Sequence, residues 1–267
     1  MPEDHGKEWT FDTVASSYEK IRPGYPDELY RAVFAYRPIG PSSHAVEVGI
    51  GGGQATLPVL KTGCAVTAVE YGEQLAKVCR EKFSGYPGFS VLTGRFEQVT
   101  LPDDAYDLVY SASAFHWIPE EIGYTKVFQI LKSGGAFTRF ANHPFRAKDD
   151  PDLFGAINEV YAKYYYTYYQ EKRQPEKYPE YSEEQAADRA RIAEKYGFTD
   201  VQYALFYKKR TLSASEYRAL IGTHSDHIAM EESIREKFFD EIEKAINRHS
   251  GIISVFDTID LELARKP

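Results

Sequence analysis

The stretch VEVGIGGGQAT, residues Val46–Thr56, places four glycines within five residues directly after a short apolar run. Such a turn between a strand and a helix predicts a cradle for a phosphate or a cofactor, because glycine admits positive φ and lets the backbone approach a ligand closely. The dinucleotide fingerprint G-x-G-x-x-G needs a small residue where Gln54 stands, and a phosphate loop needs a Lys followed by Ser or Thr that the stretch lacks. The form that fits is E-x-G-x-G-x-G, carried by Glu47, Gly49, Gly51 and Gly53.

Strands and helices are predicted to alternate on either side of this loop. Short apolar segments typical of strands lie at residues 45–48, 65–70, 89–93, 107–112, 136–141, 201–209 and 252–264. Helical spacing of apolar residues occurs at residues 26–37, 54–62, 72–84, 119–131, 183–196, 213–222 and 231–248. This alternation predicts an α/β fold with a doubly wound, mostly parallel seven-stranded sheet.

One segment interrupts the alternation. Residues 143–182 are rich in tyrosine and charge and contain two prolines. We predict a helical insertion that caps the ligand edge of the sheet. The expected organisation is a single-domain core in which residues 1–142 form the N-terminal cover segment and the cofactor-binding part, residues 143–182 the Tyr-rich cap, and residues 183–267 the C-terminal part.

Composition bounds the class of partner. The formal net charge is -8 and no block of Lys and Arg occurs, which argues against nucleic acid and favours a small-molecule ligand. The N-terminal MPEDHGKEWTFD is acidic and polar, and no run approaches the roughly 18 apolar residues of a membrane span. We expect a cytoplasmic protein without a membrane contact, as a monomer or homodimer.

The glycine motif resembles the first motif of class I S-adenosylmethionine (SAM)-dependent methyltransferases, in which glycines wrap the methionine part of the cofactor. Glu70 ends the second predicted strand, where these enzymes carry an acid for the ribose hydroxyls, and a carboxylate offers two oxygens for a diol. The N-terminal FDTVASSYEKIRPGYP and the late THSDH extend the similarity toward small-molecule enzymes of the trans-aconitate methyltransferase type. The resemblance implies a Rossmann-like methyltransferase fold, with its motifs at residues 45–140.

The stretch TGRFEQVTLPDDAYDLVYSASAFHWI is similar to the following segments of that family, which border adenine and the transferred methyl group. The chain departs from the family at Arg95, where many members carry an Asp for the adenine amino group, so that contact would come from the next two residues. The resemblance therefore implies cofactor contacts at Tyr18, Glu47, Gly49, Gly51, Gly53, Glu70, Tyr71, Phe96, Glu97 and Ser111.

The acceptor side is predicted from residue chemistry at the expected sheet edge. His116 follows strand four, where a neutral imidazole serves as a general base or packs beside Trp117. Arg22 fits a bidentate clamp on a carboxylate, or a surface arginine beside a proline turn. Tyrosines between residues 161 and 169 are spaced for one helical face, which predicts a substrate wall or a packing seam. The candidates are His116 as catalytic residue and Arg22, Tyr25, Trp117, Tyr165, Thr223 and Ser225 for substrate.

No metal is predicted, because His224 and His227 lack helical i, i+4 spacing and, in this interpretation, an acidic third ligand. The predicted function is SAM-dependent methyl transfer to a carboxylate, hydroxyl or amine of a small molecule, with S-adenosylhomocysteine as product. Two alternatives stay open: an NAD(P)-dependent oxidoreductase, which Gln54 disfavours, and a SAM-binding protein without catalysis.

Overall fold

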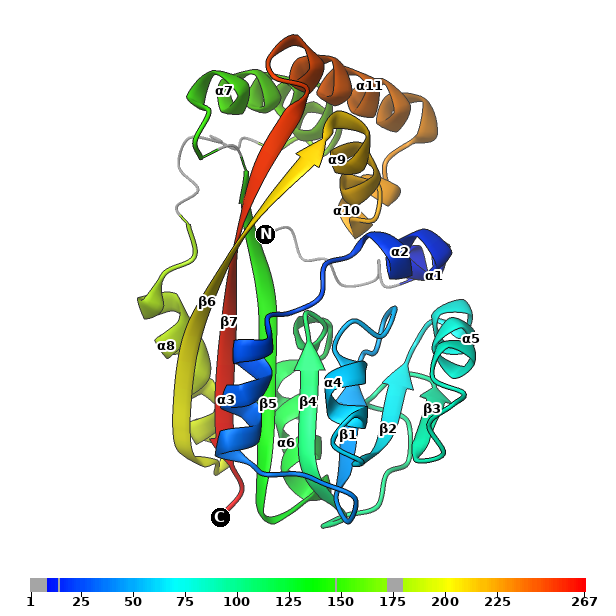
Figure 1. The fold of residues 1–267 in the computed structure, drawn as a ribbon, viewed down its shortest axis with the longest axis vertical. Coiled ribbons are helices and arrows are strands. Elements are labelled where there is room, and N and C mark those ends of the chain that lie inside the picture. Colours follow the sequence, from blue (N-terminus) through cyan, green and yellow to red (C-terminus); the bar gives the residue numbers. More distant parts are fainter. Residues whose placement is uncertain (1–8, 14, 147, 172–179) are drawn as a thin grey trace. The chain divides into compact units, whose positions relative to one another are not determined.

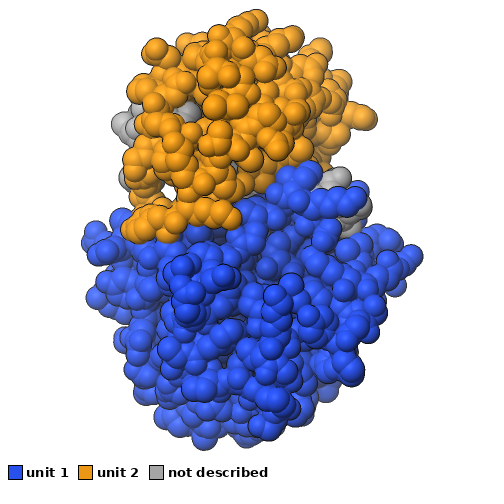
Figure 2. All heavy atoms as spheres, viewed as in Figure 1, with its two compact units in different colours: residues 1–142, 182–206, 259–267 blue, residues 143–181, 207–258 orange. Residues whose placement is uncertain are grey.

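The computed structural model describes residues 9–13, 15–146, 148–171 and 180–267. The chain forms two compact units (Figure 2). Unit 1 comprises residues 1–142, 182–206 and 259–267, and unit 2 comprises residues 143–181 and 207–258. The segment predicted as a cap therefore belongs, except for its last residue, to the same unit as residues 207–258.

A seven-stranded sheet has the order β3-β2-β1-β4-β5-β7-β6 (Figure 1). Its strands are β1 (His44–Val48), β2 (Ala65–Glu70), β3 (Phe89–Thr93), β4 (Tyr106–Ala112), β5 (Leu131–Arg146), β6 (Thr199–Ser213) and β7 (Ile252–Arg265). β1 pairs in parallel with β2 and β4, β2 with β3, and β4 with β5. The carboxyl ends of β1, β2 and β4 therefore meet at one edge, where open sheets bind ligands.

The last two strands make the sheet mixed. Near its start, β5 exchanges backbone hydrogen bonds with the end of β7, from Gly134 N to Lys266 O and from Lys266 N to Gly135 O. Further along β5, Ala141 N donates to the side chain of Asp260, which lies earlier in β7. Rising numbers on one strand thus meet falling numbers on the other, so β7 is antiparallel to β5. The sheet is therefore mixed, with the parallel pairs of β1 to β5 followed by the antiparallel strand β7.

Most predicted elements of unit 1 are confirmed to within a few residues. Its helices are α1 (Trp9–Thr13), α2 (Ala15–Ile21), α3 (Asp27–Tyr36), α4 (Thr56–Leu60), α5 (Glu73–Lys82), the 3-10 turn η1 (Phe115–Trp117), α6 (Glu120–Ile130) and α8 (Glu183–Arg191) with its 3-10 extension η4 (Ile192–Tyr196). Gly197 ends that extension with φ 88°, as a left-handed helix end requires. The prediction fails for β5, which extends well beyond residues 136–141 at both ends.

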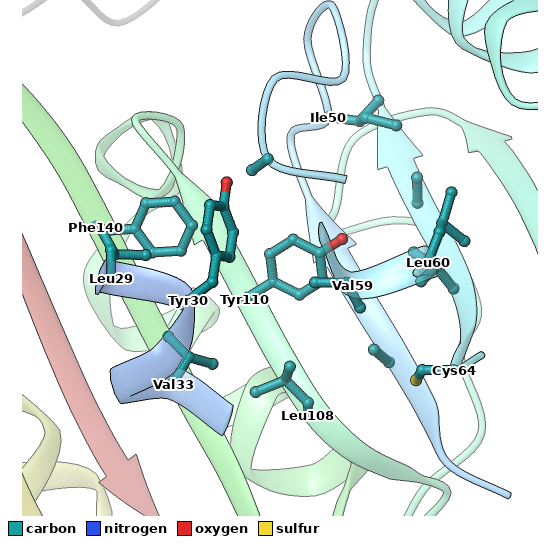
Figure 3. Close-up of a cluster of buried hydrophobic side chains, with 14 of the residues drawn as sticks. Leu29, Tyr30, Val33, Ile50, Val59, Leu60, Cys64, Leu108, Tyr110 and Phe140 are labelled. Carbon is teal, nitrogen blue, oxygen red and sulfur yellow. The ribbon is translucent and has the colours of Figure 1, made fainter. Parts of the chain in front are cut away.

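A buried apolar cluster in unit 1 holds α3 and α4 against the sheet (Figure 3). Leu29 of α3 and Leu108 of β4 are completely buried. Tyr110, also on β4, is 1% exposed, and its hydroxyl donates to the buried carboxylate of Glu47. Each fully buried aliphatic side chain contributes about 2 kcal/mol relative to an exposed one. The cluster therefore fixes the strand ends that carry the glycine loop.

Unit 2 contains α7 (Pro151–Val160), the π-helix η2 (Tyr161–Tyr166), α9 (Ala214–Ile221), α10 (Ser225–Ile228) and α11 (Glu232–Arg248). α11 packs against α7, α9 and η2. Of the expected aromatic face, Tyr161 and Tyr165 are buried, with ring centroids 5.6 Å apart, and the tyrosines at 164, 168 and 169 are half-buried. Across the described part of the chain, no helix is both long and apolar enough to span a bilayer.

Candidate functional site

The glycine loop follows β1 at the carboxyl edge of the sheet. Gly49, Gly51 and Gly53 have φ of 72°, 55° and 73°, a region that side chains with a Cβ adopt at a cost. A Cβ on Gly49 would lie 2.4 Å from the Cβ of Ala114, and one on Gly53 would lie 2.6 Å from Cε2 of Phe83. The loop therefore depends on glycine for its conformation and also for the space around it.

Glu70 ties the end of β2 to this loop. Its Oε2 accepts a hydrogen bond from Gly51 N at 2.8 Å, and its Oε1 accepts one from Gly72 N at 2.9 Å. Burial raises the pKa of Glu70, and these two hydrogen bonds oppose the rise. A carboxylate oxygen accepts more than one hydrogen bond, so the arrangement leaves capacity for a diol while holding the acid in place.

Glu47 lies beneath the loop at the end of β1 and is 1% exposed. Its Oε2 accepts hydrogen bonds from Thr56 Oγ1 at 2.7 Å and Tyr110 Oη at 2.8 Å. Its Oε1 is buried without a hydrogen-bond partner among the described residues. Burial raises its pKa to about 7 against the opposing effect of the two hydroxyls. A buried acid with one unsatisfied oxygen is a site for a hydrogen-bond donor or a cation.

Helix α2 of the N-terminal segment lies on the loop. Gln54 Nε2 donates to Tyr18 O at 3.4 Å and to Glu19 O at 3.3 Å. Lys82 Nζ, at the end of α5, donates to the Glu19 carboxylate at 2.7 Å and to Gly52 O at 2.9 Å. Sequence reasoning treated Gln54 only as a missing glycine and gave Lys82 no role, because their partners are far away in sequence.

Two of the predicted site residues meet through Phe11. The Phe11 ring lies 5.5 Å from the Tyr18 ring and 5.7 Å from the Trp117 ring, edge-on to both. The Arg22 guanidinium lies 5.0 Å from the Tyr18 ring centroid. Tyr18, Arg22 and Trp117 therefore gather at one side of the glycine loop, since a Cβ on Gly51 would meet the Tyr18 ring at 3.3 Å.

Tyr25 and His116 take different positions near the end of β4. The Tyr25 hydroxyl lies 2.9 Å from Ser113 Oγ, and its ring packs edge-on against Phe140. Burial raises the pKa of Tyr25 above its usual range, so the hydroxyl is neutral at physiological pH. His116 is exposed on η1, and its ring centroid lies 5.1 Å from that of Trp117. The imidazole is thus accessible at the edge where it was expected.

The residues expected to contact the cofactor near β3 and β4 differ in whether their side chains are accessible or buried. The Arg95 guanidinium stacks on the exposed Tyr71 ring at 4.5 Å, a cation–π contact. The Phe96 side chain is buried in the core, and its carbonyl accepts a hydrogen bond from Lys126. Ser111 is buried and donates to a backbone carbonyl of β1. Arg95 and Tyr71 therefore present the accessible surface here, and half-buried Glu97 lies two residues after Arg95.

Tyr165, Thr223 and Ser225, predicted to bind substrate, belong to unit 2 and are all buried. The Tyr165 hydroxyl donates to Asp226 Oδ2 at 2.7 Å. The Thr223 hydroxyl donates to Leu220 O at 2.6 Å, where it completes the end of α9. The protons of the Tyr165 and Thr223 hydroxyls are therefore committed to partners within unit 2.

The prediction that His224 and His227 lack an acidic third ligand is wrong. His224, Asp226 and His227 offer ligand atoms that all lie within 4.8 Å of one another, so an acidic third group is present. Asp226 Oδ1 already accepts the His227 backbone N–H at 2.9 Å. Although burial opposes it, the two imidazoles hold the pKa of Asp226 well below its usual value. The absence of a metal stays a prediction.

Comparison with known proteins agrees with this geometry. Residues 46–138 match the model of the methyltransferase domain. A methyltransferase of Geobacillus sp. strain WCH70, itself uncharacterised, is 34% identical over 146 residues, covering 51% of this chain and 67% of the relative. The chain belongs to the methyltransferase family. The matched residues contain most of β1, the glycine loop, Glu70 and β4, whereas Tyr18, Arg22 and Tyr25 lie before the match.

Solved structures share the fold. A protein of Anaeromyxobacter dehalogenans that carries the provisional name type II methyltransferase superposes with a TM-score of 0.63 at 19% identity, covering 91% of this chain and 97% of its own. Phosphoethanolamine N-methyltransferase 2 of Haemonchus contortus, in complex with phosphomonomethylethanolamine and S-adenosylhomocysteine, gives 0.54 at 15% identity, covering 96% of this chain and 57% of its own. At these identities the likeness concerns the Rossmann-like fold.

Proposed function

We propose that this protein is a SAM-dependent methyltransferase that acts on a small molecule. The observation that carries the proposal is the joining of the glycine loop to the acid of β2, through the hydrogen bond from Gly51 N to Glu70 Oε2. Glycines after β1 and an acid ending β2 are what the family resemblance implied for the methionine and ribose parts of SAM. The Haemonchus structure holds S-adenosylhomocysteine on the same fold, which supports this cofactor.

The residues present fit SAM chemically. The cofactor carries an ammonium group, a carboxylate, a ribose diol and a sulfonium. Glu47 supplies a buried carboxylate with one unsatisfied oxygen, which suits a cation or a donor. The positive-φ glycines keep side chains out of the loop, so that backbone can contact the ligand. In this proposal Glu47 and the glycine loop hold the methionine part, Glu70 holds the ribose, and Arg95 with Tyr71 borders adenine.

SAM supplies an already activated methyl group. The task left to the protein is to orient the acceptor and exclude water, which is catalysis by proximity. The segment fastened by Gln54 and Lys82 covers the loop and would exclude water from it. For a hydroxyl or amine acceptor, the exposed imidazole of His116 would take the proton. For a carboxylate acceptor no base is needed, and Arg22 would hold the anion by its fork.

Titration calorimetry with SAM, S-adenosylhomocysteine and NADH tests the cofactor. We expect both sulfur nucleosides to bind and NADH not to bind. Glu70→Gln should weaken their affinity by about tenfold, because an amide accepts at only one of its two terminal atoms, which is worth about 1.5 kcal/mol. Glu73→Gln, an exposed acid three residues away, is the matched control. Binding of NADH alone, or equal affinities in Glu70→Gln and the control, would contradict the proposal.

Catalysis is tested separately from binding. Purified protein and isotopically methyl-labelled SAM are incubated with fractionated small metabolites, and labelled products are detected by mass spectrometry. We expect labelled product and S-adenosylhomocysteine in equal amounts. His116→Asn should lower the turnover number, with little change in SAM affinity, if the acceptor must lose a proton. SAM binding without any product over the whole panel would favour the alternative of a SAM-binding protein without catalysis.

A further inference from the structure

Arg146, the last residue of β5, is held in unit 2 by neutral groups. Its guanidinium lies 4.2 Å from the centroid of the Tyr161 ring, and its Nη2 donates to Asn158 Oδ1 at 3.1 Å. A further hydrogen bond joins its side chain to Tyr217. Its Nε is buried and has no hydrogen-bond partner among the described residues. The Tyr161 ring therefore holds one face of the guanidinium, and two hydrogen bonds hold its edges, while the Nε–H stays unsatisfied.

Three other arginines of the described residues that are largely buried each pair with an acid. Arg139 forms an ion pair with Glu262, Arg189 with Asp260, and Arg210 with Asp257. Arg146 forms no ion pair with any carboxylate in the described residues, and its strongest electrostatic neighbours are tyrosines. An arginine stays charged at any physiological pH, and a desolvated charge without a counter-ion is costly. Among the described residues, no acid neutralises the positive charge of Arg146.

The surroundings of this cation are rigid. Tyr161 is 7% exposed and packs edge-on against Phe238 of α11 with a centroid distance of 4.9 Å. Asn158 is buried on α7, and Tyr217 is buried on α9. Three helical elements thus fix the ring, the amide and the hydroxyl around Arg146. Because the guanidinium has no acceptor, Tyr217 accepts its hydrogen bond and keeps its own phenolic proton to donate.

We propose that Arg146 is an anion-binding residue, and that with Tyr217 it binds an oxyanion within unit 2. The unsatisfied Nε–H and an adjoining Nη–H match the two oxygens of a carboxylate, or two oxygens of a phosphate, as a bidentate fork. The Tyr217 hydroxyl would donate to the same anion. The missing counter-ion is then supplied by the ligand.

Binding is tested on the full chain at constant ionic strength. The probes are malonate, citrate, inorganic phosphate, glycerol 3-phosphate and, as the uncharged control, malonamide. We expect at least one anion to raise the unfolding temperature in a saturable way and to bind by calorimetry, with malonamide inactive. Selective binding of the carboxylates or of the phosphates identifies the oxyanion. No saturable binding of any of these anions at millimolar concentration would overturn the proposal.

Three variants assign that binding to Arg146. Arg146→Gln should lose the anion-dependent shift, and Arg146→Lys should bind about tenfold more weakly because an ammonium lacks the planar fork. Arg248→Gln, which removes an exposed arginine from the same unit, should bind like the unaltered protein. Equal anion affinity in Arg146→Gln and Arg248→Gln would overturn the assignment.

A stability measurement separates an anion site from a purely structural arginine. Without added anion, Arg146→Met should unfold at the same temperature as the unaltered protein or at a higher one, since it removes an uncompensated charge. Arg210→Met should unfold at a lower temperature, because it leaves buried Asp257 without its partner. An equal loss in both variants would show that Arg146 is structural and would contradict the proposal.

The two proposals fail independently. Titration of SAM and S-adenosylhomocysteine is run on the same samples as the anions. Binding of the nucleosides without any anion would remove the anion site and leave the methyltransferase proposal standing. Binding of anions through Arg146 without either nucleoside would remove the methyltransferase proposal and leave an anion-binding site.

Discussion

Replacing Glu47 by glutamine should change how the stability of this protein depends on pH. Burial raises the pKa of Glu47 from 4.5 to about 7. The folded protein therefore binds this proton more tightly than the unfolded chain does. Its contribution to stability is fully present below about pH 4.5 and is lost as the pH rises through about 7. Glutamine does not titrate, so Glu47→Gln removes that loss.

The magnitude follows from the two pKa values. The pKa of Glu47 differs by about 2.5 between the folded and unfolded states, and each pH unit of that difference is worth about 1.4 kcal/mol. The unfolding free energy should therefore change by about 3 kcal/mol between pH 4.5 and pH 8. The Glu47→Gln variant keeps an amide oxygen as acceptor for the hydroxyls of Thr56 and Tyr110, so the hydrogen bonds are preserved. Relative to the unaltered protein, the variant should gain about 3 kcal/mol over this pH range, or roughly 6–12 °C in unfolding temperature.

The assay is thermal unfolding at half-unit steps from pH 4.5 to pH 8, without ligand. Glu184→Gln removes an exposed carboxylate of α8 and serves as the control. The curves for the control and the unaltered protein should run parallel, and the curve for Glu47→Gln should diverge from them above about pH 5. A Glu47→Gln curve parallel to the others would show that this acid is not held in a desolvated site, which would refute the reasoning.

Further predictions concern the space around a loop glycine, the attachment of the N-terminal segment and a buried ion pair. Gly53→Ala should cost about 2 kcal/mol of unfolding free energy in chemical denaturation, from positive φ and a close ring contact, whereas Gly40→Ala, with open space around it, should cost nothing measurable. Lys82→Ala should weaken SAM binding in calorimetry by about fivefold, because it removes the hydrogen bond to Glu19 that fastens α2, and an unchanged affinity would contradict the fastening role. Glu262→Gln should lower the unfolding free energy by about 3 kcal/mol, because it leaves buried arginine charge unpaired, and a neutral result would argue against a buried pair.

The candidate site shows how far sequence reasoning reaches. The glycine loop and Glu70 were predicted from a short motif and its distance to the next strand, and both lie together at the edge of the sheet. The two motifs meet at one edge because β1 and β2 are parallel neighbours, so their carboxyl ends lie together. Thr223 was predicted to bind substrate, yet its hydroxyl donates to Leu220 O at the end of α9. Nothing in a sequence shows which partner a hydroxyl selects.

The amino-acid sequence by itself determined the alternation of strands and helices, the position of the glycine loop and the acid that ends β2. These features are encoded locally, by hydrophobic period and by the conformational freedom of glycine. Only the tertiary structure decided that β7 runs antiparallel to β5 and that Gln54 and Lys82 hold the N-terminal segment. It also decided that Arg139 meets a carboxylate while Arg146 meets tyrosines. Charge compensation depends on contacts between residues distant in sequence, which form only when the chain packs.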